Sequence, residues 1–540
     1  MEYTVRLESV KLENIKNVLN GKIKIHDDKK TRNCDIVGIY GQNGSGKTAV
    51  IDCMEIIQEL FMGRSLNDRR FLDCLNVNSP YSKISAGFFV TSEGVGHYVV
   101  YEVEFRLVGG CKPIDFFIAK ESLRCAGGGV RTVFSCDFEN DDELFSPKRL
   151  FGELPSVKKK MKTRLAAQKL LAKEQKKSLI FSQTAAELLK ERALYEKEES
   201  EKALNAKSLN EKAAYKNASA EKSLSGKFLN SQETNEKILN TRDLNGKERD
   251  GKTLNTKTAC KKNAASTETP LEKSAANAVG GTLSAIISIL GQYANMDLFV
   301  IKNSHSGIIS LNELIPFSFK IVEGGARIVK GEAGIRLDQP TLFPMVGYKD
   351  VSVLIGQLNV VIKSLVPDLK IELKEYGEQV GDDGEPCMKF EVLARRKGEL
   401  LPLRNESEGI KKIISILSAL ISFYNRENTI VLIDELDAGI FEYLLGELLS
   451  VLQENARGQL IFTSHNLRPI EILDPESIYF TSCNPNNRYI RPENVGKNVN
   501  LRDFYYRAIE LGGQKERLYD ETDLSELSLA LRTAGGNIKL

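Results

Sequence analysis

The sequence lacks the features of membrane, secreted and zinc-binding proteins. It contains no unbroken apolar run of the roughly 18 residues that a membrane span needs, and its most apolar stretch, residues 413–424, includes three serines. Residues 1–12 alternate charged and apolar side chains and have no signal-peptide core. The nine cysteines are scattered, odd in number and never arranged as Cys-x-x-Cys. This pattern favours reduced thiols in a cytoplasmic protein.

The chain also lacks a net charge of either sign, because 75 Lys and Arg residues nearly balance 73 Asp and Glu residues. The balance is uneven along the sequence. Residues 156–277 carry 27 basic and 16 acidic residues, whereas the remainder carries 48 basic and 57 acidic residues. We therefore expect an acidic body that carries a basic insertion.

The insertion has two parts with different patterns. Residues 151–202 are rich in Ala, Leu, Lys and Glu, which predicts a helical, coiled-coil-like arm or a solvated surface helix; both interpretations stay open. In residues 203–280, Leu-Asn pairs begin at 204, 209, 229, 239, 244 and 254, always a multiple of five apart. A period of five fits neither a helix nor a strand. We expect a disordered, low-complexity tract there rather than a β-solenoid.

The strongest motif is a phosphate-binding loop near the N-terminus. Residues 41–48 read GQNGSGKT, which is a complete G-x-x-x-x-G-K-[ST] pattern between an expected strand (36–40) and an expected helix (49–60). Backbone N–H groups of such a loop surround a phosphate, and the helix N-terminus adds its positive dipole end. Lys47 would neutralise the β- and γ-phosphates, and the Thr48 hydroxyl would bind Mg²⁺. The predicted nucleotide-binding residues are Asn43, Gly44, Ser45, Gly46, Lys47 and Thr48.

Carboxylates follow a second apolar strand far downstream. Residues 429–433 read TIVLI and lead directly into Asp434 and Glu435, with Asp437 two residues later. A buried strand aims carboxylates at its carboxyl end into the crevice where a phosphate loop opens. Asp434 is therefore the expected Mg²⁺ ligand, and Glu435 is placed to polarise the water that attacks the γ-phosphate.

Two further polar motifs lie in the same half of the chain. Residues 459–463 form another expected buried strand, and His465 follows it closely, so a contact with the γ-phosphate is favoured over a structural role. Ser407 and Gly409 precede an apolar helix expected over residues 410–424. By itself this pair is a helix cap that offers backbone donors to an anion.

The order of these motifs resembles that of the ABC-type ATPases, in the branch that includes RecF, SMC proteins and OLD-like bacterial ATPases. The resemblance covers about residues 1–107 and 345–500. It implies an α/β fold, a P-loop ABC-type ATPase head split by a helical (coiled-coil-like) and low-complexity insertion. It also implies ATP and Mg²⁺ as cofactors, and two heads that sandwich two nucleotides in a homodimer or a higher homo-oligomer.

In such a sandwich, Ser407 and Gly409 of one subunit contact the γ-phosphate that Lys47 of the other subunit binds. The resemblance places Asp437 at the same interface and has His465 sense the γ-phosphate within its own subunit. Two departures are present. The signature, residues 405–409, reads NESEG rather than the LSGGQ of transporters, and no Gln lies between Gln58 and Gln168 to act as the usual Q-loop residue. The second departure predicts slow hydrolysis.

Only 75 residues follow His465, too few for the nuclease domain of OLD proteins, so we expect an ATPase without nuclease activity. Such ATPases resemble the subunits of anti-phage systems such as Septu and PARIS that control a separate nuclease or toxin. A DNA-repair ATPase of SMC or RecF type and a non-catalytic, ATP-dependent assembly module are the alternatives, and DNA or a phage protein is a further candidate partner. An acidic cluster at Asp520, Glu521, Asp523 and Glu526 fits an exposed helix face better than a metal site.

The expected organisation is one ATPase domain in two pieces. The N-terminal lobe spans 1–150, the arm 151–202, the repeat tract 203–280, the base of the insertion 281–345 and the C-terminal lobe 346–540.

Overall fold

Both halves of the chain contribute to one central sheet. The computed structural model describes residues 3–25, 35–108, 114–140, 145–147, 160–225, 279–323, 327–493, 495 and 499–535. The sheet has the strand order β18-β17-β3-β16-β15-β8, in which β17, β3, β16, β15 and β8 run parallel. Its strands are β3 (Asp35–Tyr40), β8 (Leu298–Ile301), β15 (Ile430–Ile433), β16 (Gln459–Thr463), β17 (Ile478–Thr481) and β18 (Tyr489–Ile490). The expected strands at 36–40, 429–433 and 459–463 are therefore neighbours.

The three motif-bearing strands of the parallel sheet are apolar along their length because both of their faces are buried. In β3, Val37 and Ile39 belong to one core with the N-terminal helix α1, while Ile36 and Tyr40 belong to a second core with α9 and α10. This layering explains the unbroken apolar runs in the sequence. The helices around the sheet include α1 (Lys47–Phe61), α9 (Glu408–Asn425), α10 (Glu442–Asn455), α11 (Arg468–Ile472) and α12 (Leu501–Glu510).

An antiparallel sheet covers α1 on the side away from the parallel sheet. Its order is β2-β1-β4-β5-β6-β7, and its alternating burial pattern reflects one face packed on the core and one face in solvent. The strands are β1 (Tyr3–Ile15), β2 (Val18–Lys24), β4 (Ser82–Ser92), β5 (Val95–Val108), β6 (Asp115–Gly127) and β7 (Val130–Asp137), and the short helix α2 (Arg69–Leu72) precedes β4. The α/β fold of a P-loop ATPase split by a helical insertion is thus confirmed.

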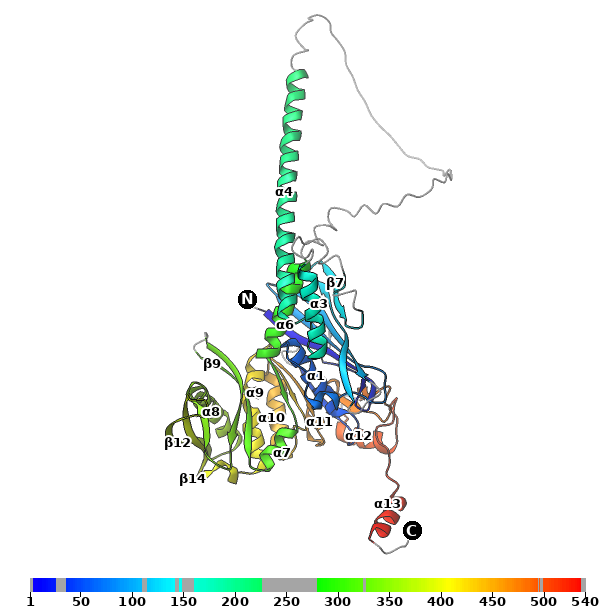
Figure 1. Cartoon of the computed structure of the whole chain (residues 1–540). Coiled ribbons are helices and arrows are strands. Elements are labelled where there is room, and N and C mark those ends of the chain that lie inside the picture. Colours follow the sequence, from blue (N-terminus) through cyan, green and yellow to red (C-terminus); the bar gives the residue numbers. More distant parts are fainter. Residues whose placement is uncertain are drawn as a thin grey trace, which may run out of the picture.

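The insertion projects from this body as a long helix. It contains α3 (Lys160–Glu174), α4 (Gln183–Ser225) and α6 (Val279–Met296), and α6 packs on the base of α4, which then extends far beyond the other elements (Figure 1). Glu196 of α4 pairs with Arg192 at 2.9 Å and accepts the backbone N–H of Gly280 at 3.1 Å, which ties the two helices together. Helix α4 runs beyond the expected boundary at residue 202. The first Leu-Asn pairs, at 204 and 209, are therefore helical, and residues 226–278 of the tract lie outside the described residues.

A side lobe (residues 304–402) has its own core. It contains α7 (Ser304–Ser310), the hairpin β9 (Leu314–Glu323) and β10 (Arg327–Arg336), then β11 (Thr341–Pro344), α8 (Met345–Leu365), β12 (Leu369–Val380), β13 (Pro386–Arg396) and β14 (Glu399–Pro402). The expected boundary at residue 345 falls between β11 and α8, which pack in this same lobe. Helix α8 is long and apolar enough to cross a membrane by length and composition, but its inner face, including Val351, Leu354 and Leu358, is part of the lobe core.

Two 3₁₀ turns and one helix complete the described elements. The turns are Leu403–Asn405, which leads into α9, and Pro475–Ser477, which leads into β17. Helix α13 (Leu524–Ala534) lies apart from the body at the bottom of Figure 1 and buries none of its residues.

Candidate functional site

The phosphate loop joins the carboxyl end of β3 to the N-terminus of α1. Gly44 and Gly46 have φ values of 72° and 89°, a left-handed conformation that glycine adopts without strain, and Gly46 is the N-cap of α1. The first N–H groups of α1 have no partner within the helix and face the loop. The sequence motif therefore forms a glycine-dependent turn at the start of α1.

Lys47 lies within this turn. Its Nζ donates hydrogen bonds to the carbonyl oxygens of Gly41 at 2.9 Å and Gln42 at 3.0 Å. Burial lowers the pKa of Lys47, and the nearby carboxylates of Glu435, Asp434 and Asp437 oppose that effect. The ammonium group is thus held at the mouth of the loop, close to the predicted carboxylates.

Thr48 and Asp434, which are 386 residues apart in the sequence, meet beside the loop. The Thr48 hydroxyl donates to Asp434 Oδ1 at 3.1 Å. Hard oxygen donors of these two types are those that Mg²⁺ prefers. The two residues that the sequence assigns to the metal therefore lie together and carry donors of the type that would hold it.

Thr463, which the sequence reasoning missed, orients both adjacent carboxylate residues. It is fully buried at the end of β16, its hydroxyl donates to Asp434 Oδ1 at 2.7 Å, and it accepts the backbone N–H of Glu435 at 2.7 Å. The signal available in the sequence was a polar residue that ends an apolar strand. Its partner could not be identified without knowing that β15 and β16 are neighbours.

Glu435 has an unusual backbone conformation for a residue other than glycine, with φ of 49°. The turn is held by Thr463 on one side and by Lys412 of α9 on the other, whose Nζ donates to the Glu435 carbonyl oxygen. Within the described residues, the Glu435 carboxylate itself makes no hydrogen bond or ion pair. A half-buried carboxylate in such a turn is available to orient a water molecule.

Lys412 is the second residue that the sequence reasoning missed. Burial lowers its pKa to about 8, against the opposing effect of Asp437, Glu435 and Asp434. It places a cation from the helix that begins after Ser407 next to the carboxylates that follow β15. It therefore links α9 to the metal-binding edge of the sheet.

Asp437 and His465 are neighbours through the backbone. Asp437 Oδ2 accepts the N–H groups of His465 at 3.1 Å and Asn466 at 2.9 Å, while Asp437 Oδ1 is buried without a hydrogen-bond partner. The His465 side chain is exposed at the same edge of the sheet. An unpartnered carboxylate oxygen of this kind is available to a further donor.

Ser407 and Gly409 form the start of α9, next to the Asp437 turn. The Ser407 side chain caps the helix by accepting the N–H of Ile410 at 3.4 Å. Gly409 packs so tightly against the backbone of Gly439 that an added Cβ would overlap the Gly439 carbonyl oxygen. Ser407 is exposed, and no hydrogen bond among the described residues joins Ser407 or Gly409 to the phosphate loop of the same chain. The structure therefore brings Lys47, Thr48, Asp434 and Glu435 together, and it leaves the Ser407 motif facing outward.

Residues far apart in the sequence support the loop from behind. The Thr481 hydroxyl donates a hydrogen bond to Ser45 Oγ at 2.6 Å, and the Tyr489 hydroxyl donates one to the Gly46 carbonyl oxygen at 2.7 Å. Asn17 lies in the β1–β2 turn, and its side-chain amide donates a hydrogen bond to the Gly44 carbonyl oxygen. The backbone carbonyl oxygen of Asn17 accepts a hydrogen bond from Arg488 Nη2 at 3.0 Å. No local motif marks these residues, because only the packing of β1, β2, β17 and β18 around the loop assembles them.

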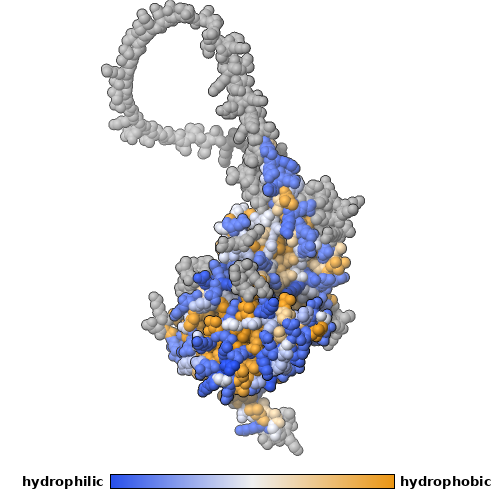
Figure 2. Space-filling model, turned by 90° about the vertical axis from the view of Figure 1, so that its left-hand side faces the viewer, coloured by the Kyte–Doolittle hydropathy of each residue, from blue (hydrophilic) through white to orange (hydrophobic). Residues whose placement is uncertain are grey.

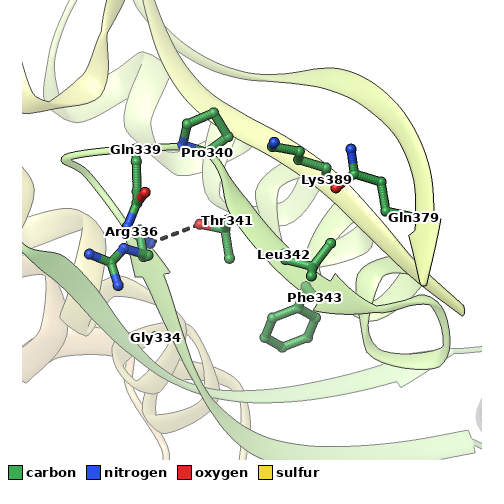
Figure 3. Close-up of a pocket in the computed structure, with 9 residues that line it drawn as sticks. All are labelled: Gly334, Arg336, Gln339, Pro340, Thr341, Leu342, Phe343, Gln379 and Lys389. Atoms are coloured by element: carbon green, nitrogen blue, oxygen red, sulfur yellow. Dashed lines mark hydrogen bonds between the residues drawn. The ribbon is translucent and has the colours of Figure 1, made fainter. Parts of the chain in front are cut away.

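The described residues contain no group of three or more His, Cys, Asp or Glu side chains placed to hold a metal, and this includes the acidic residues 520, 521, 523 and 526. A pocket of about 470 Å³ lies in the side lobe, where β10 and β11 diverge, and Arg336, Thr341 and Lys389 are among its lining residues (Figure 3). The Arg336 backbone N–H donates to the Thr341 hydroxyl at 2.9 Å. None of the sequence-predicted site residues lines this pocket.

The family of the chain follows from comparison with known proteins. A model of the AAA ATPase domain family matches residues 6–468, a range that contains the phosphate loop, Ser407, the carboxylates and His465. The protein therefore belongs to the AAA ATPase domain family. No curated protein matches the sequence.

Solved structures also resemble this chain. One is the Smc head domain from Pyrococcus furiosus, with an extended coiled coil and bound to the C-terminal domain of ScpA. The sequence identity is 13% and the TM-score is 0.35, and the match covers 94% of this chain and 99% of that chain. Another is an Smc head bound to the C-winged helix domain of ScpA, with 11% identity, a TM-score of 0.36, and coverage of 90% and 98%.

Proposed function

We propose that this protein is an ABC-type ATPase that binds ATP with Mg²⁺, hydrolyses it and dimerises, or assembles further, around the bound nucleotide. The meeting of Thr48 and Asp434 at 3.1 Å beside the phosphate loop carries this proposal. Residues from the two ends of the sequence form one site with a hydroxyl, a carboxylate and an ammonium group in the places that ATP and Mg²⁺ need.

Each residue has a chemical task in this proposal. The backbone N–H groups of residues 43–48 bind the phosphates, and Lys47 neutralises their charge. Thr48 and Asp434 hold Mg²⁺, which supplies further neutralisation of the charge that develops on the phosphates. Glu435 accepts a hydrogen bond from the attacking water, in a turn fixed by Thr463 and Lys412. His465 contacts the γ-phosphate from the same edge of the sheet.

The outward position of Ser407 supports a second subunit in the site. The start of α9 offers an exposed hydroxyl at Ser407, and within the described residues it makes no hydrogen bond to the phosphate loop of its own chain. In the proposed sandwich, Ser407 and Gly409 contact the γ-phosphate bound by Lys47 of the partner copy, and Asp437 lies at the same interface. ATP then closes the two heads on each other, and hydrolysis opens them.

Loss of the loop lysine tests the ATPase proposal. Binding of ATP measured by calorimetry and phosphate release measured in steady state are both expected for the purified chain, and Lys47→Ala is expected to abolish both. Phosphate release that survives Lys47→Ala would come from another site or a contaminant, and would overturn the proposal. Sedimentation with and without ATP tests the sandwich separately.

The biological role that we propose is that of a cytoplasmic sensor or scaffold subunit in bacterial anti-phage defence, which controls a separate nuclease or toxin. Its support is the resemblance of the motif order to ATPases of that kind. Co-expression with genes adjacent to its own tests the role. An adjacent effector that copurifies with this chain and is released on ATP hydrolysis supports it, and an adjacent set of recombination genes opposes it.

The shape of the insertion favours one second candidate, a DNA-repair ATPase of SMC or RecF type. Helix α4 projects from the head as a long arm that carries eight basic and eight acidic residues (Figure 1). If the arm binds DNA, counterion release makes the affinity fall steeply as salt rises. DNA binding that is absent, or unaffected between about 50 and 200 mM salt, opposes this candidate.

A third candidate is a non-catalytic module that uses ATP only to assemble. The Glu435→Gln variant distinguishes this module from both ATPase candidates.

A further inference from the structure

Helix α13 has an apolar face that is not buried by any of the described residues. Leu524, Leu527 and Leu531 recur at positions i, i+3 and i+7, so they share one face, and Leu524 and Leu531 are 75% and 66% exposed. The hydrogen bonds described for α13 stay within the helix and its Asp523 cap. An isolated helix of 11 residues is marginal in water, so this face requires a partner surface.

Helix α8 has a matching exposed face on the side lobe. Val346, Val353 and Val360 are seven residues apart, which places them along one side of the helix. Val346 and Val360 are 79% and 74% exposed, and Val353 between them is half-buried against the lobe core. Gly356 lies in the same row with open space above it. Figure 2 looks onto the side of the molecule that carries the lobe, where hydrophobic residues form a connected band among hydrophilic ones.

The two faces are complementary in charge and length. Lys349 and Lys363 flank the valine row, and the single acidic residue of α8, Asp350, is buried. The N-terminal end of α13 carries acidic residues instead, at positions 520, 521, 523 and 526. The valine row spans about 21 Å and α13 about 16 Å at 1.5 Å per residue, so the whole helix can lie along the row.

The position of the segment before α13 favours a partner in a second copy. Asp520 donates its backbone N–H to the Gln42 side chain of the phosphate loop at 3.1 Å, so α13 departs from the nucleotide-binding edge. Helix α8 packs on α9, whose first residues carry Ser407. In the head-to-head sandwich of the proposed function, on which this step rests, α9 of the partner copy faces the nucleotide-binding edge. Because α8 packs on α9, α8 of the partner copy then lies near the same edge.

We propose that α13 of one copy docks along the exposed face of α8 on a second copy, and that the exchange is reciprocal. The leucine row packs on the valine row, and the acidic end of α13 lies near the lysines. The contact is isologous, so two copies close into a dimer with two such docked helices. Because it uses no nucleotide atom, it holds the dimer together whether or not ATP is bound.

Sedimentation equilibrium of the nucleotide-free Lys47→Ala protein tests the contact apart from ATP binding. We expect a species of twice the 60.2 kDa chain mass. Leu527→Asp and Val360→Asp are each expected to raise the dimer dissociation constant at least tenfold. Leu529→Asp and Ser352→Asp are the matched controls, since Leu529 is on the opposite face of α13 and Ser352 is exposed on α8 but lies about 80° around the helix from Val360; both are expected to leave the dimer intact.

Crosslinking decides which surfaces meet. Copies of two different lengths, one with Leu527→Cys and one with Val360→Cys, are mixed and treated with a short bismaleimide. A covalent product that contains one copy of each length is expected, and Leu529→Cys in place of Leu527→Cys is expected to give none.

Three results overturn the proposal: a monomer under nucleotide-free conditions, a dimer that Leu527→Asp dissociates but Val360→Asp does not, and crosslinks that form only within one copy when both cysteines are present. Each of these outcomes leaves the ATPase proposal untouched. If the unaltered chain forms the dimer but does not bind ATP, the ATPase proposal alone is contradicted.

Discussion

Thr463 and Asp434, at the ends of neighbouring strands and 29 residues apart, share a hydrogen bond of 2.7 Å that places the Asp434 carboxylate beside Thr48. The same hydroxyl accepts the N–H of Glu435. One buried side chain thus positions both carboxylate residues on which metal binding and water activation depend in the proposed mechanism.

Replacing Thr463 with valine is expected to impair this arrangement. Val keeps the volume but leaves the Glu435 N–H buried without a partner, at a cost of about 1–3 kcal/mol in the free energy of unfolding. The apparent Mg²⁺ affinity and kcat are both expected to fall about tenfold or more, as measured by Mg²⁺-dependent phosphate release. Thr429→Val is the matched control, because Thr429 is equally buried and its hydroxyl has no hydrogen-bond partner, so its loss is expected to be neutral.

Glu435→Gln is expected to lower kcat at least a hundredfold while ATP binding is kept, because the amide cannot accept a proton from water. ATP-bound dimers are expected to accumulate, and size-exclusion chromatography with light scattering detects them in a protein that also carries Leu527→Asp, which removes the proposed α13 contact. A protein that uses ATP only for assembly would instead show the same dimerisation and the same function with or without this change.

Lys47→Ala is expected to weaken ATP binding at least a hundredfold, because the phosphates lose their nearest cation in a buried site. Calorimetry measures the loss, and circular dichroism checks that the fold is intact. Unchanged ATP affinity in a folded variant would contradict the assignment of the loop.

Gly409→Ala is expected to separate nucleotide binding from ATP-dependent dimerisation. The new Cβ collides with the Gly439 carbonyl and pushes the start of α9 away from the Asp437 turn. ATP binding at Lys47 is expected to persist, while ATP-dependent dimerisation weakens at least tenfold in sedimentation experiments on proteins that also carry Leu527→Asp. Gly307→Ala, a helical site in α7 with open space around it, is the control and is expected to be neutral or stabilising by up to about 1 kcal/mol.

Lys412 predicts a pH dependence of stability. Its pKa is lowered to about 8 in the folded protein, so the unfolded chain binds more protons between pH 8 and the ordinary lysine pKa of about 10.4. Stability contributed by this group therefore rises with pH across that window, by about 3 kcal/mol at most. Urea unfolding at several pH values measures it, and Lys412→Met is expected to remove the rise. An equal rise in the variant would assign it to other groups.

The sequence predicts those parts of the fold that are defined by a pattern of contiguous residues. The phosphate loop, the apolar strands before Asp434 and His465, and the helix after Ser407 are all formed close to where their patterns place them, because each is defined by contiguous residues. The five-residue period did not predict that α4 continues to Ser225, since helix-forming composition outweighs the mismatch of period there. The boundary expected at residue 345 was misplaced because no local signal marks a lobe whose core joins β9 to α8.

The sequence by itself determined the chemistry of this protein: a glycine-rich loop with a lysine and a threonine, two carboxylates after a buried strand, and a serine at a helix start. Only the tertiary structure decided which of these groups meet. The order β3-β16-β15 brings both Thr48 and Thr463 to Asp434, and the packing of α9 adds Lys412. Contacts between strands hundreds of residues apart depend on sheet order, which the local spacing of residues does not encode.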